Sequence, residues 1–461
     1  MITAFDIRSK LNNAATLAPA FALYVEDVEL RRDLTQWITR IEFEHAVGMA
    51  DMMKIRATNP YLDAAPSSAS PDLTSHKAFA PGNEADLFLG YDGNPDNFIG
   101  RAIFARHLPN FRAAGQPELT VTGYAKSHLM MGLSGELIGT NTTRPKPEEE
   151  PEEDLDEEDQ KGKVWQGWSH WMIVQELAEK WKMRLDGQTG SFGSRLENNP
   201  EQGLIQPKDM SDYEFLKGLA DLNDYEFWVD YDYSHKQWTM HWRQANDQQT
   251  HICHFHYGAP EADLIQFQAE YGLSGTINEL VALGWDDETQ TWLNVLRVEG
   301  VDGEDPRFRT GAGLRNNARR DAQHNQGFDD DDDYEDDLAG GGDEEWLTEN
   351  LSSMTKFRLA AGGAAIDVVV RPFESMEDLA VFATRWFRAR RDSFLIGRGR
   401  LVGHPQIRAR QVHRISGLGN RLSGDYYFTQ VRHVYDLTGR GELPYVTEFV
   451  AHKVIRGDEG Q

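Results

Sequence analysis

The chain has 461 residues, of which 39% are hydrophobic, and its formal net charge is −28. This length is too great for one ordinary core and predicts two to four domains. The negative charge argues against nucleic acids and anionic membranes as partners, because both repel an acidic protein.

The acidity is concentrated in two tracts. Ten acids lie in Glu148–Asp159, eight in Asp329–Asp337 and three in Asp343–Glu345. Without these 21 acids, 54 remain against 47 Lys and Arg, an ordinary balance for a globular protein. We expect both tracts to be disordered, since self-repelling segments with little apolar surface cannot offset the entropy of ordering. A surface facing a basic partner is the alternative. A calcium loop is disfavoured, because Asp329–Asp337 lacks the spaced acid pattern of such loops.

Cys253 is the single cysteine, so no intramolecular disulfide can form. The first 25 residues lack a basic start followed by a long apolar core, and no stretch reaches the roughly 18–20 apolar residues of a membrane span. We therefore expect a soluble protein that is folded in the cytoplasm.

Residues 1–144 are predicted to form a first β-barrel domain. Period-2 alternation places Phe21, Leu23 and Val25 on one strand face, and Trp37, Thr39, Ile41 and Phe43 on another, with Arg40, Glu42 and Glu44 pointing the opposite way. Turn-rich pieces separate further strands, which predicts a barrel or sandwich. These strands are expected at Asp51–Arg56, Ala85–Leu89, Phe98–Arg106 and Leu119–Tyr124.

An acidic, Pro-rich linker is expected at 145–163 and an α/β module at 164–250. Ser169 precedes a helix predicted to end near Gly187, with Ile173, Val174, Leu177 and Trp181 on its buried face. A second helix starts with a capping box formed by Ser211 and Glu214, and buries Phe215, Leu216 and Leu219. A hairpin of Tyr225–Asp230 and Gln237–Trp242 follows, with Trp238, Met240 and Trp242 on one face.

Residues 251–461 are predicted to form a second β-barrel domain, with a disordered acidic insertion at about 302–347 and a helix at 375–391 capped by Ser375 and Asp378. The helix buries Leu379, Phe382, Ala383 and Trp386, while Arg385, Arg388 and Arg391 lie off that stripe. The expected strands are Leu264–Gln268, Thr276–Trp285, Thr291–Glu299, Tyr426–Tyr435 and Tyr445–Val454. The fold class is thus α+β, mainly β.

The strongest chemical candidate is the segment that holds His251, Cys253, His254 and His256. On a strand, His251 and Cys253 point one way and His254 and His256 the other, so either pair supplies only two metal ligands. A stable zinc site usually has three or four, so ordinary strand histidines are the favoured interpretation. No nucleophile elbow, phosphate-binding loop or dinucleotide fingerprint occurs. We expect no enzyme activity, catalytic residue, metal or cofactor.

Three segments in order along the chain resemble one family. The first runs from Pro81-Gly-Asn-Glu through Tyr91, Phe98-Ile-Gly100 and Pro109-Asn-Phe111, and the second is Ser211-Asp-Tyr-Glu-Phe-Leu-Lys-Gly-Leu-Ala220. The third holds Gly403-His-Pro405-Gln-Ile-Arg-Ala, Ile415-Ser-Gly417-Leu-Gly419, Gly424-Asp-Tyr426 and Tyr445-Val-Thr447-Glu-Phe449. Together they resemble the phage late control protein D family, which includes VgrG-like baseplate hub proteins of contractile tails and injection systems.

The resemblance implies a structural hub that forms a homotrimer. Two tube-protein-like barrels per chain would make a pseudo-sixfold ring, which matches a hexameric inner tube on one side and a trimeric spike on the other. The partners it implies are an inner tube protein, a separate spike protein and baseplate wedge proteins. The particle, a phage tail, a tailocin or a related contractile injection system, would be assembled in the cytoplasm and could then be released. Two alternatives are a bifunctional hub with cell-wall-degrading activity, and a metal-dependent hydrolase that uses His254 and His256.

Overall fold

The computed structural model describes residues 18–58, 73–112, 116–132, 162–165, 167–187, 204–223, 225–244, 249–258, 263–271, 279–286, 291–298, 307–310, 366–370, 395–420, 422–438 and 443–454. These residues fall into two compact units. The first contains the chain up to Glu270 together with Ile396–Val454, and the second contains Tyr271–Leu395. The two acidic tracts and the predicted helix at 375–391 lie outside the described residues.

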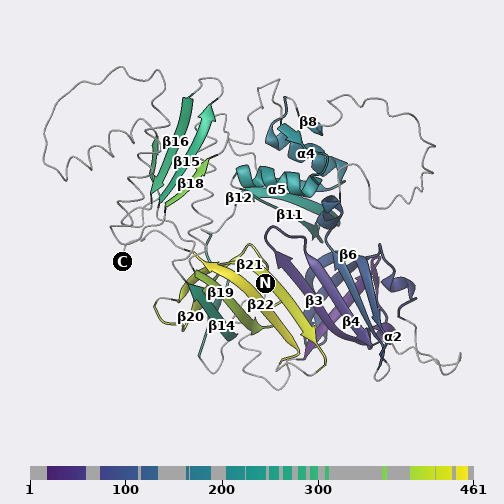
Figure 1. Cartoon of the computed structure of the whole chain (residues 1–461). Coiled ribbons are helices and arrows are strands. Elements are labelled where there is room, and N and C mark those ends of the chain that lie inside the picture. Colours follow the sequence, from purple (N-terminus) through teal and green to yellow (C-terminus); the bar gives the residue numbers. More distant parts are fainter. Residues whose placement is uncertain are drawn as a thin grey trace, which may run out of the picture. The chain divides into compact units, whose positions relative to one another are not determined.

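A large β-sheet dominates the first unit, and both ends of the chain contribute strands to it (Figure 1). The strand order is β14-β19-β22-β21-β3-β4-β7-β6-β5-β1-β2, with β20 joined to β21 and β13 joined to β20. The amino-terminal strands are β1 (Pro19–Val25), β2 (Val28–Glu29), β3 (Ile38–Ala46), β4 (Met52–Thr58), β5 (Glu84–Tyr91), β6 (Asn94–Asn110) and β7 (Glu118–Tyr124). The carboxyl-terminal strands are β13 (His254–His256), β14 (Leu264–Tyr271), β19 (Leu395–Val402), β20 (Val412–Ser416), β21 (Gly424–Asp436) and β22 (Tyr445–Lys453).

The two groups of strands meet at an antiparallel seam between β3 and β21. It runs from the pair Gln430 and Ala46 to the pair Asp436 and Arg40. In Figure 1 the purple β3 and the yellow β21 therefore belong to one sheet. The mainly β, α+β class is confirmed. Within the described strands the order ends at β14 on one side and β2 on the other, so hydrogen bonding does not close either group into a barrel.

One detail of the predicted strand pattern in β3 is wrong. A bulge between Ile38 and Arg40 interrupts the pairing with β4, so the side-chain alternation changes phase there. Ile38 is consequently buried, whereas Thr39, predicted to lie on the inner face, is not. Beyond the bulge, Ile41 and Phe43 occupy the core as predicted.

The α/β module contains β8 (Lys163–Trp165), α4 (His170–Lys180), β9 (Arg184–Gly187), β10 (Leu204–Gln206), α5 (Asp212–Leu222), β11 (Tyr225–Asp232) and β12 (Gln237–Gln244). The predicted capping box is confirmed: Ser211 Oγ accepts from the Glu214 amide, and Glu214 Oε2 accepts from the Ser211 amide. The predicted end of the first helix near Gly187 is wrong. The helix ends at Lys180 and the chain re-emerges as β9, because residues 184–187 pair in parallel with β12.

The module shares an apolar core with the amino-terminal strands. Trp165, Met240 and Trp242 of the module belong to the same buried cluster as Ala125 and Met130, which follow β7. The predicted inner face of β12 is therefore confirmed. Shorter helices complete the first unit: α2 (Arg32–Thr35), η1 (Lys77–Phe79) and η2 (Lys126–Met131).

The second unit is built on a four-stranded sheet in the order β17-β16-β15-β18. The strands are β15 (Glu279–Asp286), β16 (Thr291–Val298), β17 (Arg307–Thr310) and β18 (Ile366–Val370). β15 pairs antiparallel with β16 and parallel with β18. In the described part of the chain, no helix has the length and apolar character required to cross a membrane.

Candidate functional site

The histidine segment singled out in the sequence lies at the β13–β20 pair. His254 Nε2 and His256 Nδ1 lie 2.7 and 2.8 Å from the hydroxyl of Ser416, so the two rings share one side of the strand as predicted. Phe255 between them is buried. His251 Nδ1 is 3.6 Å from Asp425 Oδ1. Burial, reinforced by Asp263, raises the pKa of the Cys253 thiol to about 11.

These side chains do not assemble into a metal centre. Across the described residues, no three His, Cys, Asp or Glu side chains come together as a set that could hold a metal ion. Both rings instead lie within hydrogen-bond distance of the Ser416 hydroxyl and so connect β13 to β20.

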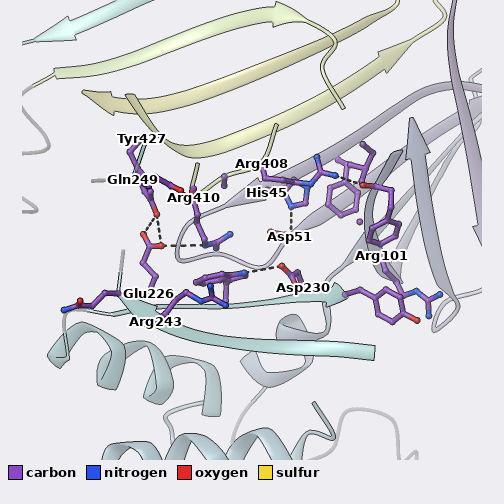
Figure 2. Close-up of a pocket in the computed structure, with 18 residues that line it drawn as sticks. His45, Asp51, Arg101, Glu226, Asp230, Arg243, Gln249, Arg408, Arg410 and Tyr427 are labelled. Atoms are coloured by element: carbon purple, nitrogen blue, oxygen red, sulfur yellow. Dashed lines mark hydrogen bonds and ion pairs between the residues drawn. The ribbon is translucent and has the colours of Figure 1, made fainter. Parts of the chain in front are cut away.

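A cavity of about 370 Å³ lies elsewhere in the first unit, between the sheet and the module (Figure 2). Three parts of the chain, far apart in sequence, line it. The amino-terminal strands supply Phe43, His45, Asp51, Phe98, Ile99, Gly100 and Arg101; the module supplies Glu226, Trp228, Asp230, Tyr231, Arg243 and Gln244; the carboxyl-terminal part supplies Gln249, Arg408, Ala409, Arg410 and Tyr427. We call this region the junction cavity.

Two arginines of the segment between β19 and β20 connect these parts through backbone carbonyls. Arg408 Nη1 donates to the carbonyls of Pro405 and Ile407 at 2.7 and 2.9 Å, and its Nη2 donates to the carbonyl of Phe98 in β6. Arg410 Nη2 donates to the carbonyl of Ala46 in β3 at 2.9 Å. Each side chain thus links the carboxyl-terminal part of the unit to its amino-terminal part.

The module contacts Tyr427 and Arg410 through a carboxylate and an indole of β11. The hydroxyl of Tyr427 donates to both oxygens of Glu226, at 2.8 and 2.9 Å. The Arg410 guanidinium lies 4.5 Å above the Trp228 ring, and its Nε is 4.0 Å from Glu226 Oε2 (Figure 2). β11, which carries Glu226 and Trp228, is thereby held against both β21 and β3.

A buried ion-pair cluster lies at the other end of the junction cavity. Arg101 donates to both carboxylate oxygens of Asp86 and to one oxygen each of Glu84 and Asp27, at 2.5–2.7 Å. Its guanidinium also lies 3.8 Å above the ring of Tyr231 in β11. Burial alone would lower the pKa of Arg101, but its bonds with Asp86 and Asp27 raise it above the ordinary value. The cation is therefore held in its charged form.

Two buried histidines belong to the strands of the β3–β21 seam: His45 of β3, which also lines the junction cavity, and His433 of β21. His45 Nδ1 is 2.7 Å from Asp51 Oδ2, and the rings of His45 and His433 are 6.2 Å apart. His433 bonds the Tyr445 hydroxyl and the Ile407 carbonyl, each at 3.0 Å. Burial lowers the pKa of His433, with a further contribution from the charge of Arg408. The ring of His433 is therefore a neutral part of the interior.

The sequence contained the residues of this site but not its geometry. The segment Gly403–Ala409 was recognised for its resemblance to a family, without a role for Arg408 or Arg410. Its glycine has a steric reason, since a Cβ on Gly403 would lie 2.2 Å from the ring of Tyr445. The local signal that could have pointed to the site is the pair Arg408 and Arg410, two residues apart in a segment that also contains Gly and Pro. The carbonyls and the carboxylate that they meet come from distant positions.

Comparison with known proteins shows the fold to be that of a tail protein. The 43 kDa tail protein of prophage MuSo2 from Shewanella oneidensis is 8% identical, with a TM-score of 0.56 over 95% of this chain and 98% of that chain. A tail protein from Neisseria meningitidis MC58 is 11% identical, with a TM-score of 0.55 over 95% and 97% of the two chains. No family model matches the sequence, and neither does any curated protein.

At these identities the similarity is one of fold. It extends over nearly the full length of all three chains, so it includes both groups of strands and the module between them. The expectation of a fold shared with phage tail proteins, derived from three short segments, is confirmed at this level.

Proposed function

We propose that this protein is the baseplate hub of a contractile phage-tail-like particle, in which three copies form a ring between the hexameric inner tube and the trimeric spike. The role is structural and not enzymatic. The inner tube protein, the spike protein and the wedge proteins of the baseplate are its partners. The protein is assembled in the cytoplasm as part of the particle, which is a phage tail, a tailocin or a related contractile injection system and can be released from the cell.

The observation that carries the proposal is the division of one sheet between two chain segments. Strands from residues 19–124 and from residues 254–453 meet at the β3–β21 seam, so one chain presents two β regions in a fixed relation. Three such chains present six β regions, which is the number needed to match a sixfold tube while keeping threefold symmetry for a spike. The likeness of fold to two tail proteins supports the same role.

The edge of the sheet offers a surface for assembly. β14 is an eight-residue strand at one end of the described strand order, and a long edge strand is a template for pairing with another chain. We propose that β14 is covered by a neighbouring copy in the ring. The contact is heterologous and must close after three copies to avoid a filament.

Native mass spectrometry of the full chain, alone and with the spike protein, tests the proposal. We expect a species of three times 52.4 kDa. Gln268→Pro in β14 removes a backbone donor and should shift the population to monomer, whereas Gln36→Pro, in the exposed turn after α2, serves as a matched control in which trimers persist. A strict monomer in the presence of spike and tube proteins would contradict the hub role. Trimers that persist with the β14 variant would contradict only the edge contact.

A further inference from the structure

The charges that line the junction cavity do not all have partners. Arg101 pairs with Asp86, Arg243 with Asp186, and Arg410 with Glu226. The acids Asp51 and Asp230 bond His45 and His241, at 2.7 and 2.9 Å. Arg408 is the remaining charged group of the lining. Within the described part of the chain, its guanidinium contacts only backbone carbonyls and no carboxylate.

Several donors of these arginines are also uncommitted. A guanidinium has five N–H groups, and Arg408 uses three of them for the carbonyls of Pro405, Ile407 and Phe98. The Nε atoms of Arg410 and Arg243 are buried and have no hydrogen-bond partner among the described residues. Both guanidinium groups lie beside one ring, 4.5 and 5.7 Å from the centroid of Trp228. A buried donor without an acceptor is unfavourable by about 1–3 kcal/mol.

The backbone holds Arg410 in an unusual conformation. Its φ angle is +68°, in the left-handed region that residues with a Cβ rarely adopt. The surroundings enforce it: the Arg410 amide donates to the Phe428 carbonyl at 2.7 Å, and Gln249 Nε2 donates to the Arg410 carbonyl at 3.1 Å. Strained residues of this kind persist where the surrounding structure over-determines them, and they concentrate at ligand sites.

We propose that the junction cavity binds a small oxyanion, a carboxylate or a phosphate, against Arg408, Arg410 and Arg243. The guanidinium group suits such ligands because its planar N–H groups match their oxygens. Arg101 and Arg243 already pair with carboxylates outside the lining, so the site offers an oxyanion its uncommitted N–H donors and not an excess of positive charge. A cavity of about 370 Å³ has room for the anion together with water. The carboxylates of Asp51 and Asp230 act on the charge of Arg408 without contacting its guanidinium, so a bound oxyanion would supply the direct contact that Arg408 lacks.

Glu226 sets the selectivity of this site. Its carboxylate is 4.0 Å from Arg410 Nε, so it repels a ligand of high charge more strongly than a monoanion. The hydroxyl of Tyr427 donates to both of its oxygens and keeps them turned toward β21. An anion that carries one charge therefore fits better than one that carries two or three.

Isothermal titration calorimetry on the full chain tests the proposal with sodium acetate and sodium phosphate as probes, against sodium chloride at the same ionic strength. We expect saturable one-site binding of at least one oxyanion and none of chloride. Arg410→Gln and Arg243→Gln should each weaken binding about tenfold, the effect of losing one charge-assisted hydrogen bond. Arg398→Gln is the matched control, since this half-exposed arginine pairs with Glu270 outside the cavity, and its affinity should equal that of the wild type.

Arg408→Gln should abolish binding, but this buried side chain also holds three carbonyls and its loss can prevent folding. The variants at Arg410 and Arg243 keep the test decisive in that case. Acetate binding alone identifies the ligand as a carboxylate, such as an acidic side chain of a partner, and phosphate binding alone identifies a phosphate. Heat without saturation, or equal affinity in all variants, means an adventitious ion only and overturns the proposal. The measurement does not depend on trimer formation, so its failure leaves the hub role untouched.

Discussion

The β3–β21 seam and the junction cavity connect the same parts of the first unit by different physical means. The seam is a ladder of backbone hydrogen bonds over seven residue pairs, with Ile41, Phe43 and Val431 buried behind it. The junction is made of side chains: arginines on carbonyls, a carboxylate on a tyrosine hydroxyl, and guanidinium groups on aromatic rings. The ladder depends on chain geometry alone, whereas the junction depends on the charge state and identity of a few residues.

This difference has a consequence for the proposed hub role. A shared ladder gives the two β regions one fixed relation, as a ring with defined symmetry requires. A junction of ion pairs around a cavity holds the module through interactions that another charge can strengthen or replace. The module is also attached through the apolar core that it shares with the amino-terminal strands, so the junction cavity is the part of this attachment that a charge could modify.

The largest effect is expected at the buried cluster of the junction. Arg101→Met leaves Asp86, which is 3% exposed, without its bidentate partner. An unpaired buried charge of this kind lowers the free energy of unfolding by about 3–5 kcal/mol. The double variant Arg101→Met/Asp86→Leu should recover most of that loss, because the buried carboxylate is gone and the other two partners, Glu84 and Asp27, reach solvent. Urea unfolding followed by tryptophan fluorescence measures both, and a double variant no more stable than the single one would refute this account.

A slightly smaller effect is expected at the seam. Ile41→Ala removes a side chain that is 1% exposed and pairs with Tyr435 across the seam. The lost contacts and the resulting cavity should reduce the free energy of unfolding by about 2–5 kcal/mol. The control is Val28→Ala, a truncation at a side chain that is 68% exposed, which should change stability by less than about 0.5 kcal/mol. Similar losses in the two variants would mean that the seam is not a tightly packed core.

A pH effect of intermediate size is expected from two buried histidines outside both regions. Burial lowers the pKa of His404 to about 4 and of His413 to about 3, from an ordinary value of 6.5. Between pH 6.5 and 4 the unfolded chain binds protons on these rings while the folded protein does not. The free energy of unfolding therefore falls with decreasing pH, by up to about 1.4 kcal/mol per pH unit for each ring. Above pH 6.5 both states are neutral and the rings contribute no pH dependence.

His404→Phe isolates the contribution of one ring. Neither nitrogen of His404 has a hydrogen-bond partner among the described residues, and the ring packs against Phe255, so Phe suits the site. Below pH 6.5 the variant should reduce the slope of the free energy of unfolding against pH by the contribution of about one proton. At pH 8 its free energy of unfolding should be nearly unchanged. Guanidinium titrations at several pH values measure this, and an unchanged slope would show that His404 is protonated in the folded protein.

The smallest effect is expected at the histidine segment. We predict no hydrolysis of peptidoglycan, ester or peptide substrates by the purified chain, because His254 and His256 both face the Ser416 hydroxyl and not a set of metal ligands. His254→Ala should leave stability within about 1 kcal/mol, as expected for a partly exposed hydrogen bond. If the wild type hydrolyses one of these substrates and His254→Ala does not, the result favours the hydrolase alternative.

Local features of the fold were determined by the sequence. The capping box of Ser211 and Glu214 was predictable because its two bonds join residues three apart, and the inner face of β12 because strand alternation is a local rule. Gly417, Gly419 and Gly424 of the third resembling segment all have positive φ angles, which glycine adopts without a Cβ clash. The end of α4 at Lys180 was missed because the parallel pairing of β9 with β12 joins segments more than fifty residues apart.

Only the tertiary structure decided how the two groups of strands combine and what the arginines contact. The seam pairs residues 40–46 with 430–436, and no local pattern specifies which distant strand lies beside β3. Arg408 and Arg410 are two residues apart in sequence, but their acceptors, the carbonyls of Phe98 and Ala46, lie more than three hundred residues away. The residue types of the junction cavity are therefore present in the sequence, whereas the cavity exists only because long-range strand pairing brings three segments to one place.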